Sequence, residues 1–289
     1  MGYFQDRTAI VTGGASGIGE MLCEELATRG ATVIAADLNL EGAQSVASTI
    51  IKNGGKATAA KLDVSNADAV RDLVTGVARE HGRLDFIFNN AGIGVGGEVR
   101  DLAPEHWRRI IEINLFGVIS GTSAAYSVMI EQGFGHIVNT ASLAGLIGSP
   151  TMTPYATTKY AVVGLSTSLR SEAESLGVRV SVVCPGFIQT GIYDSSTFVN
   201  ANKAAFLKQI PFKLMDARAA AGKILRGVER NRAIIVFPFY ARFFWWLARI
   251  NPRLLSPLSR KTVNDFHRAR IDTAGQDGST RSSVSSVAD

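Results

Sequence analysis

The sequence contains few of the residues that form disulfides and metal sites. Cys23 and Cys184 are the only cysteines among 289 residues, and neither has a spaced Cys or His companion. The four histidines, at positions 81, 106, 136 and 267, are scattered without metal-ligand spacing. We therefore expect both thiols to lie in the core and any catalysis to proceed without a metal ion.

The chain also lacks a long apolar run near its start. Asp6 and Arg7 precede the short apolar run TAIVT, so the sequence shows no signal peptide. We therefore expect a cytoplasmic location. Residues 237–261 are apolar and aromatic, but Pro238, Arg242 and Arg249 interrupt this segment too often for it to span a bilayer.

Positive charge is scarce in the first three quarters of the chain. The whole sequence has a net charge of +5, yet residues 223–289 hold 12 Lys and Arg against 5 Asp and Glu. This last segment therefore carries +7, and the first 222 residues carry −2. The distribution argues against nucleic-acid binding by the main body and leaves the basic end to be explained separately.

Short β-branched runs alternate with stretches long enough for helices. We predict strands at residues 8–12, 31–37, 57–64, 84–90, 135–142, 179–185 and 233–237. Such alternation is typical of a parallel sheet covered on both faces, and right-handed crossovers make it an α/β doubly wound sheet of about seven strands. Ligands of this architecture bind beyond the carboxyl ends of the strands. We expect one domain over residues 1–236, a packed extension over 237–273 and a disordered tail over 274–289.

The first predicted strand runs into the glycine-rich stretch TGGASGIGE, Thr12 to Glu20. Glycines between a strand and a helix let the backbone approach a pyrophosphate, and the helix N-terminus offers free amides and a positive dipole. The second strand ends at Asp37, whose carboxylate can bind ribose hydroxyls and would repel a 2′-phosphate. This pattern predicts NAD as the cofactor rather than NADP.

A tyrosine and a lysine stand four residues apart in a predicted helix that has Thr153 as cap and Pro154 in its first turn. At this spacing Tyr155 and Lys159 share one helix face, whereas Tyr160 is rotated by about 100° from Lys159. A positive charge nearby can favour the phenolate of a tyrosine that acts as a base. We interpret Tyr155 as the acid/base candidate and Tyr160 as a packing residue.

Several of these motifs occur in one order: TGGASGIG, NNAG at Asn89–Gly92, Asn114 in NLFG, Ser142, the pair Tyr155 and Lys159, and Pro185-Gly186. In this order they resemble the short-chain dehydrogenase/reductase family over roughly Tyr3 to Val236. The resemblance implies a Rossmann fold, a nicotinamide cofactor, a homodimer or homotetramer, and the catalytic residues Asn114, Ser142, Tyr155 and Lys159. It further implies that Asn114 kinks its helix and positions a water between Lys159 and solvent.

The resemblance also implies a set of cofactor contacts. These are Gly13, Ser16, Gly17, Ile18 and Gly19 at the pyrophosphate; Asp37, Asp63, Val64, Asn90, Ala91 and Gly92 at the adenosine; and Tyr155, Lys159, Pro185, Gly186, Ile188 and Thr190 toward the nicotinamide. Ser142 ends a predicted strand beside the same crevice, where its hydroxyl can hold a substrate oxygen.

The residues that would contact the substrate are largely apolar. Residues 191–215 contain Ile192, Tyr193, Phe198, Phe206, Leu207 and Phe212. We therefore expect a hydrophobic secondary alcohol or ketone, such as a steroid, an aromatic or a lipid-like compound. The alternative is a catalytically silent nucleotide sensor or scaffold, which the intact tetrad disfavours. For residues 237–261 three roles stay open: a pocket lid or subunit interface, contact with an anionic membrane surface, or packing on the core.

Overall fold

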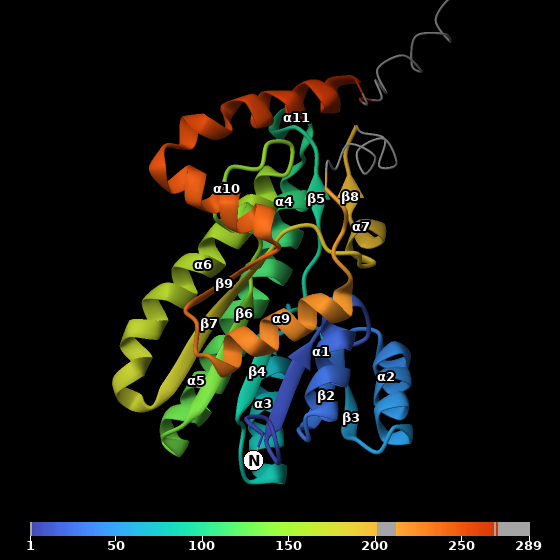
Figure 1. Cartoon of the computed structure of the whole chain (residues 1–289). Coiled ribbons are helices and arrows are strands. Elements are labelled where there is room, and N and C mark those ends of the chain that lie inside the picture. Colours follow the sequence, from blue (N-terminus) through green and yellow to red (C-terminus); the bar gives the residue numbers. More distant parts are fainter. Residues whose placement is uncertain (1, 201–211, 269, 271–289) are drawn as a thin grey trace, which may run out of the picture.

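Figure 1 shows the computed structural model, in which residues 2–200, 212–268 and 270 are described. Seven parallel strands form one sheet in the order β3-β2-β1-β4-β6-β7-β9. Their bounds are β1 (Thr8–Thr12), β2 (Thr32–Asp37), β3 (Lys56–Lys61), β4 (Phe86–Asn89), β6 (Gly135–Thr140), β7 (Val178–Pro185) and β9 (Ile234–Phe237). The strand order reverses direction between β1 and β4, so a crevice opens there at the carboxyl ends. This architecture confirms the predicted doubly wound sheet.

Helices cover both faces of the sheet (Figure 1). One layer consists of α1 (Gly17–Thr28), α2 (Leu40–Lys52) and α9 (Ala217–Glu229). The other consists of α3 (Ala67–His81), α5 (Gly117–Gln132) and α6 (Thr153–Ala173), which is followed by η4 (Glu174–Leu176). Because both faces are covered, strands such as β1 and β4 are buried at every residue, which explains their uninterrupted apolar runs.

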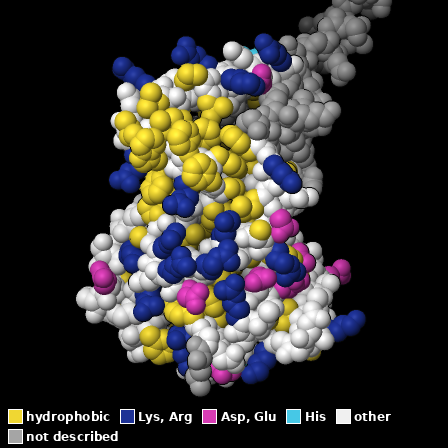
Figure 2. Space-filling model, viewed as in Figure 1, with side chains coloured by type: hydrophobic (Ala, Val, Ile, Leu, Met, Phe, Trp, Pro, Cys, Tyr) yellow, Lys and Arg dark blue, Asp and Glu magenta, His cyan; other side chains and the backbone are white. Residues whose placement is uncertain are grey.

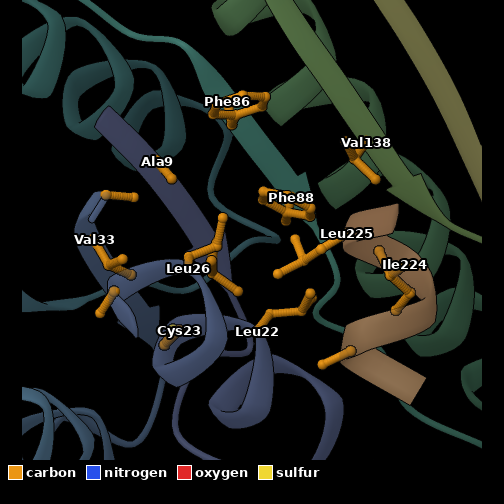
Figure 3. Packing of buried hydrophobic residues seen from close by; sticks show 14 of the residues in the cluster. Ala9, Leu22, Cys23, Leu26, Val33, Phe86, Phe88, Val138, Ile224 and Leu225 are labelled. Carbon is orange, nitrogen blue, oxygen red and sulfur yellow. The ribbon is translucent and has the colours of Figure 1, made fainter. Parts of the chain in front are cut away.

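Large apolar side chains interdigitate in the core between α1, α9 and the sheet. In Figure 3, Leu22 and Leu26 of α1 lie near Leu225 of α9 and Phe88 of β4. All four side chains are at most 1% exposed. Burying one leucine of this kind stabilises the fold by about 1.5–3 kcal/mol. This packing holds the start of α1, and with it the glycine-rich loop, at a defined place beside the crevice.

Predicted and observed element ends differ by up to three residues. The third strand stops at Lys61 rather than Val64, because the Asp63 carboxylate accepts the Ser65 N–H at 2.9 Å and turns the chain. The strand predicted over residues 135–142 is β6, which stops at Thr140. Helix α6 has Met152 as its N-cap rather than Thr153, since the Ala156 N–H donates to the Met152 carbonyl at 2.8 Å.

A change of helix type surrounds Asn114. Helix α4 (Pro104–Ile111) passes into a five-residue π-helical turn, η2 (Glu112–Phe116), before α5 begins. This irregularity is where the resemblance predicts a kink. The stretch Pro104–Gln132 contains an 18-residue window long and apolar enough to cross a membrane, yet its α5 part packs against α3 and the sheet.

The carboxyl ends of the strands are covered by smaller elements. These are β5 (Val95–Gly96), η1 (Val99–Asp101), η3 (Leu143–Gly145), α7 (Ile192–Ser195), β8 (Thr197–Phe198), α10 (Phe239–Ile250), η5 (Pro252–Leu255) and α11 (Ser256–Arg268). Figure 1 shows α10 and α11 crossing above the end of the sheet. The predicted disordered tail, residues 274–289, lies outside the described residues, as do Phe206 and Leu207 of the predicted substrate segment.

Candidate active site

A cavity of about 590 Å³ opens at the carboxyl ends of the strands. It brings together most of the residues that the sequence predicts: Gly13, Ser16, Gly17, Ile18, Asp37, Asp63, Val64, Asn90, Ala91, Gly92, Ser142, Tyr155, Lys159, Pro185, Gly186, Ile188 and Thr190. Gly19 and Asn114 are not among its lining residues in the described part of the chain, because both lie behind its wall. The cavity extends from Asp37 at one end to α11 at the other.

The glycine-rich loop has a backbone that only glycine adopts without strain. Gly13 and Gly17 have φ of +67° and +57°. A Cβ on Gly19 would meet the Gly13 carbonyl oxygen at 1.9 Å, so the start of α1 presses directly on the loop. Ser16, the N-cap of α1, makes no capping bond to the described α1 backbone, and it lines the cavity. The loop therefore fits a dinucleotide pyrophosphate, which α1 amides and the Ser16 hydroxyl can bind.

Thr12 ties the NNAG segment to this loop. Its hydroxyl accepts the N–H of Asn90 at 3.0 Å and that of Ala91 at 3.1 Å. The Asn90 side chain in turn donates to the Thr12 carbonyl at 3.2 Å. These bonds hold the ends of β1 and β4 together under the cavity, where the strand order reverses.

Asp37 ends β2 at the rim of the cavity. Its carboxylate accepts the Ala15 N–H at 3.0 Å and the Asn39 N–H at 2.9 Å. The β2–β3 register places Lys61 opposite Asp37, a cation that the sequence reasoning did not consider. Among the cavity-lining residues of the described chain, Lys159 is the single Lys or Arg.

Tyr155 and Lys159 lie on the same face of α6, as their spacing predicts. The Lys159 Nζ lies 5.5 Å from the centre of the Tyr155 ring and donates to the Thr140 carbonyl at 2.9 Å. Lys159 is only 3% exposed, and burial lowers its pKa to about 8. Its positive charge is therefore complete below about pH 7 and is lost as the pH rises through 8.

The pKa of Tyr155 runs against the sequence expectation. Burial raises this pKa above its usual value near 10, and a side-chain hydrogen bond with Ser142 opposes the rise. Desolvation is the largest influence on this pKa, and the nearby Cys184 adds to the rise. The protein by itself therefore does not favour the phenolate.

Asn114 is fully buried beside Lys159. Its side-chain oxygen accepts the Ile93 N–H at 2.8 Å, and its side-chain nitrogen donates to the Ile93 carbonyl at 2.9 Å. A Cβ on Gly92 would lie 3.2 Å from the Asn114 oxygen and 3.6 Å from the Lys159 nitrogen. Asn114 therefore anchors the segment after β4, while its predicted role in holding a water stays a prediction.

Within the single chain, Tyr160 does not pack in the core as the sequence interpretation expected. Its side chain is 46% exposed on the outer side of α6, whereas Tyr155 lines the cavity. Adjacent positions on a helix differ by about 100°, so the turn that directs Tyr155 and Lys159 inward directs Tyr160 outward.

The C-terminal helices supply a wall that the sequence reasoning did not assign residue by residue. Leu255, Leu258, Ser259 and Thr262 of η5 and α11 line the cavity, together with Tyr240 and Phe244 of α10. The Tyr240 hydroxyl accepts the Phe187 N–H at 2.7 Å, and its ring stacks on Phe212 with the centroids 4.1 Å apart. Gly186 packs so closely against Tyr240 that a Cβ at this position would lie only 2.5 Å from the Tyr240 oxygen. The many aromatic residues at positions 237–247 could have indicated that α10 lines the cavity. The sequence of α11 carries no comparable pattern.

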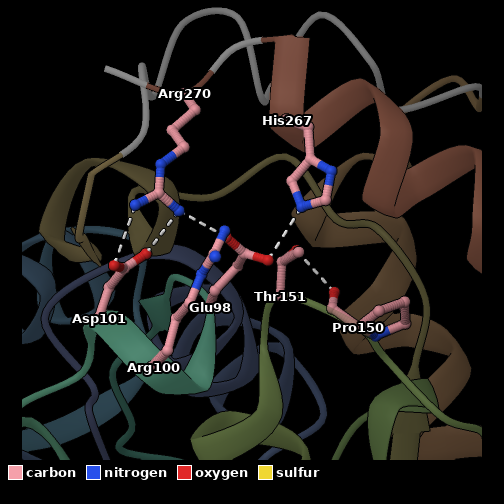
Figure 4. A network of polar contacts seen from close by, with 7 residues as sticks. All are labelled: Glu98, Arg100, Asp101, Pro150, Thr151, His267 and Arg270. Atoms are coloured by element: carbon pink, nitrogen blue, oxygen red, sulfur yellow. Dashed lines mark hydrogen bonds and ion pairs between the residues drawn. The ribbon is translucent and has the colours of Figure 1, made fainter. Parts of the chain in front are cut away.

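A polar network holds the end of α11 against η1 (Figure 4). Glu98 contacts His267 at 2.9 Å, Arg100 at 2.7 Å and Arg270 at 2.6 Å, and Arg270 also reaches Asp101 at 2.9 Å. The hydrogen bonds from His267 and Arg100 lower the pKa of Glu98 to about 2. The carboxylate therefore stays charged at neutral pH and keeps α11 over the cavity.

Comparisons with known proteins agree with this geometry. The family model described as short chain dehydrogenase matches residues 7–198. The chain is 31% identical over 272 residues to a probable oxidoreductase EphD of Mycobacterium tuberculosis, covering 91% of this chain and 46% of that protein. It thus spans about half the length of that relative. It is 38% identical over 188 residues to a cyclohexanol dehydrogenase of Acinetobacter sp., covering 65% of this chain and 75% of the relative.

A solved structure gives the same result. It is a short chain dehydrogenase/reductase from Burkholderia phymatum in complex with NAD, with a TM-score of 0.76 and 28% identity over 82% of this chain and 90% of that one. The matched region contains the glycine-rich loop, the strand-end residues around the cavity, and the pair Tyr155 and Lys159. The chain belongs to the short-chain dehydrogenase family of oxidoreductases.

Proposed function

We propose that this protein is an NAD-dependent oxidoreductase that transfers a hydride between the nicotinamide and a hydrophobic secondary alcohol or the matching ketone. One observation carries the proposal. Tyr155, Lys159 and Ser142 line a single cavity between a dinucleotide-binding loop at one end and apolar side chains at the other. The similarity to a cyclohexanol dehydrogenase supports an alcohol or ketone as the substrate.

A bound nicotinamide supplies the hydride acceptor in oxidation and the donor in reduction. During oxidation the Tyr155 oxygen takes the hydroxyl proton as the hydride leaves the carbinol carbon, and in reduction it returns this proton. The Ser142 hydroxyl donates a hydrogen bond to the substrate oxygen and so stabilises the charge that develops there. The Lys159 ammonium, 5.5 Å from the centre of the Tyr155 ring, is close enough to favour the phenolate when the proton is transferred.

The experiment that tests this function follows nicotinamide absorbance with purified full-length protein. A panel of cyclic, aromatic, steroid and long-chain secondary alcohols and ketones is offered with NAD and with NADP. Saturable turnover with an apolar member of the panel is the expected result. Cofactor binding without turnover of any member would instead support the silent sensor or scaffold.

The preference for NAD rests on Asp37. Replacing Asp37 with alanine is expected to lower kcat/KM for NAD about tenfold and to shift the preference toward NADP, because a ribose acceptor and a repulsive charge are lost together. Steady-state kinetics with both cofactors measure the change. The carboxylate also accepts two backbone N–H groups, so thermal unfolding is recorded as well. Asp68→Ala is the control, since Asp68 lies outside the cavity. A wild-type enzyme that prefers NADP would overturn this assignment. Lys61, which lies opposite Asp37, would then be the candidate partner of the 2′-phosphate.

The substrate end of the cavity supports an apolar ligand. Its walls include Tyr193, Phe212, Tyr240, Phe244, Leu255 and Leu258. Such a lining binds ring systems and alkyl chains and leaves a sugar with unpaired hydroxyls.

Leu258 offers a test of this wall. Leu258→Phe is expected to lower kcat/KM for a bulky ketone by at least ~10-fold and to change that for a small ketone less than about threefold, because the larger ring removes room from the cavity. The comparison uses cyclohexanone and a steroid ketone. Leu254→Phe is the matched control, since Leu254 is 49% exposed and does not line the cavity. An equal loss for both ketones would show that Leu258 does not set specificity.

We also propose a cytoplasmic homodimer or homotetramer. The helical stretch η2–α5 and helix α6 expose the apolar side chains of Phe116, Ile130 and Tyr160, which are between 39% and 48% accessible in the single chain. Side chains of this size on two neighbouring helices are typical of a subunit contact.

A further inference from the structure

Helix α10 has two apolar sides with different surroundings. Tyr240 and Phe244 point into the active-site cavity. On the other side, Phe239 is 81% exposed, Phe243 46%, Trp246 57% and Ile250 58%. Their spacing of four, three and four residues makes one continuous stripe along the helix. We call Phe239, Phe243, Trp246 and Ile250 the outer stripe. Figure 2 shows apolar side chains gathered over this part of the molecule.

A basic cleft adjoins the outer stripe. It has a volume of about 310 Å³, and its cationic walls are Lys223, Arg226 and Arg230 of α9 and its end, Arg232, and Arg242 of α10. Phe239 lines the same cleft, so the positive groups and the first ring of the stripe meet there. Figure 2 shows dark blue side chains in a band next to the apolar area.

Within the described residues, no carboxylate neutralises the charges of the basic cleft. No Asp or Glu is among its described lining residues, and none of its five cations forms an ion pair with a carboxylate in residues 2–200, 212–268 or 270. Arg218, also on α9, differs because Glu24 and Glu25 pair with it. The cleft is therefore a preformed site of positive potential that attracts anions.

An anionic lipid surface matches both features together. Lipid phosphates satisfy the cations, while the boundary between headgroups and acyl chains buries aromatic and aliphatic side chains. A second copy of the chain related by a two-fold axis would bring two clusters of five cations together, which like-charge repulsion disfavours. A nucleic acid offers phosphates, but its backbone leaves aliphatic members of the stripe such as Ile250 without an apolar partner.

We propose that the outer stripe and the basic cleft together dock this protein on the surface of a bilayer that contains anionic lipid. The stripe enters the headgroup boundary and the cleft receives lipid phosphate groups. Docking is peripheral, because α10 is a 12-residue helix whose opposite side lines the cavity. None of these nine residues lines that cavity, so docking does not depend on the proposed reaction.

Co-sedimentation of the full-length protein with vesicles tests the docking. Binding to phosphatidylglycerol vesicles at low salt is expected to be at least ~10-fold tighter than to phosphatidylcholine vesicles and to weaken as salt is added, since each surface cation adds about fivefold in affinity and salt screens it. The variant Arg226→Glu with Arg242→Glu is expected to lose at least ~10-fold of this binding.

Two further variants distinguish docking from general electrostatics. Lys52→Glu with Arg79→Glu makes the same change in net charge on exposed residues outside the basic cleft, and its binding is expected to stay within about twofold of the parent. Phe239→Ser with Trp246→Ser removes half of the stripe and is expected to weaken binding at every salt concentration. Thermal unfolding confirms that each variant is folded.

Four results would overturn the proposal. The first is a folded parent protein that does not bind anionic vesicles at low salt. The second is equal binding by the two charge-reversal variants. The third is a change of oligomeric state by Phe239→Ser with Trp246→Ser while vesicle binding stays the same, which would assign the stripe to a subunit contact. Calorimetric binding of inorganic phosphate without any vesicle binding would likewise assign the cleft to a soluble anion.

Discussion

Replacing Tyr155 with phenylalanine is expected to lower kcat by about 10² to 10⁴-fold while the affinity for NAD stays within about twofold. The substitution removes one oxygen and keeps the ring that packs in the cavity wall. The nearby groups in the described cavity are poor substitutes for Tyr155. The Ser142 hydroxyl is a much weaker acid than a phenol, Lys159 is bonded to the Thr140 carbonyl, and burial raises the pKa of the Tyr193 phenol. Stopped-flow and steady-state absorbance, together with a cofactor titration, separate the two effects.

Tyr160→Phe is the matched control for this experiment. It makes the same chemical change on the same helix, but at a side chain that is 46% exposed outside the cavity. Its turnover is expected to stay within about twofold of the parent, as for most surface substitutions. If Tyr155→Phe behaves as this control does, Tyr155 has no part in proton transfer.

Replacing Lys159 with methionine is expected to lower kcat for alcohol oxidation by about 10²-fold at neutral pH. A unit charge about 5.5 Å from the centre of the Tyr155 ring contributes about 3 kcal/mol at an effective dielectric constant near 20, which corresponds to about 10²-fold in rate. Without the ammonium group, burial alone determines the pKa of Tyr155, and this pKa rises further. The rise of the oxidation rate with pH should therefore move to higher pH.

The pH profile of the parent enzyme distinguishes this role from a structural one. Burial lowers the pKa of Lys159 to about 8, so its charge is present below that value and disappears above it. We expect the parent oxidation rate to stop increasing above about pH 8, and the methionine variant to lack this break. A variant with unchanged thermal unfolding and the parent profile, merely scaled down, would contradict electrostatic support by Lys159.

Much of the site follows from local patterns. Strand-ending residues such as Thr12, Asp37 and Asn90 meet at one edge because parallel strands align their carboxyl ends, and the strand runs were visible in the sequence. Tyr155 and Lys159 share a helix face because they stand four residues apart. These relations depend on neighbours along the chain, so the sequence was sufficient to predict them.

Other features required the packing of distant segments. Asn114 is recognisable as a motif residue, but only the structure shows it bonded to the Ile93 backbone instead of facing the cavity. The outward position of Tyr160 follows from helix rotation once the inward face is known. The raised pKa of Tyr155 depends chiefly on its burial, which its spacing from Lys159 does not show.

The sequence by itself determined the doubly wound sheet, the glycine-rich loop and the spacing of Tyr155 and Lys159, since strand periodicity, glycine backbone freedom and helix rotation are local properties. Only the tertiary structure decided that α11 closes the substrate cavity with Leu258. It also decided that one side of α10 lines this cavity while the other side is exposed. Burial and desolvation are sums over contacts between segments that are distant in the chain, and no local pattern encodes which of those contacts form.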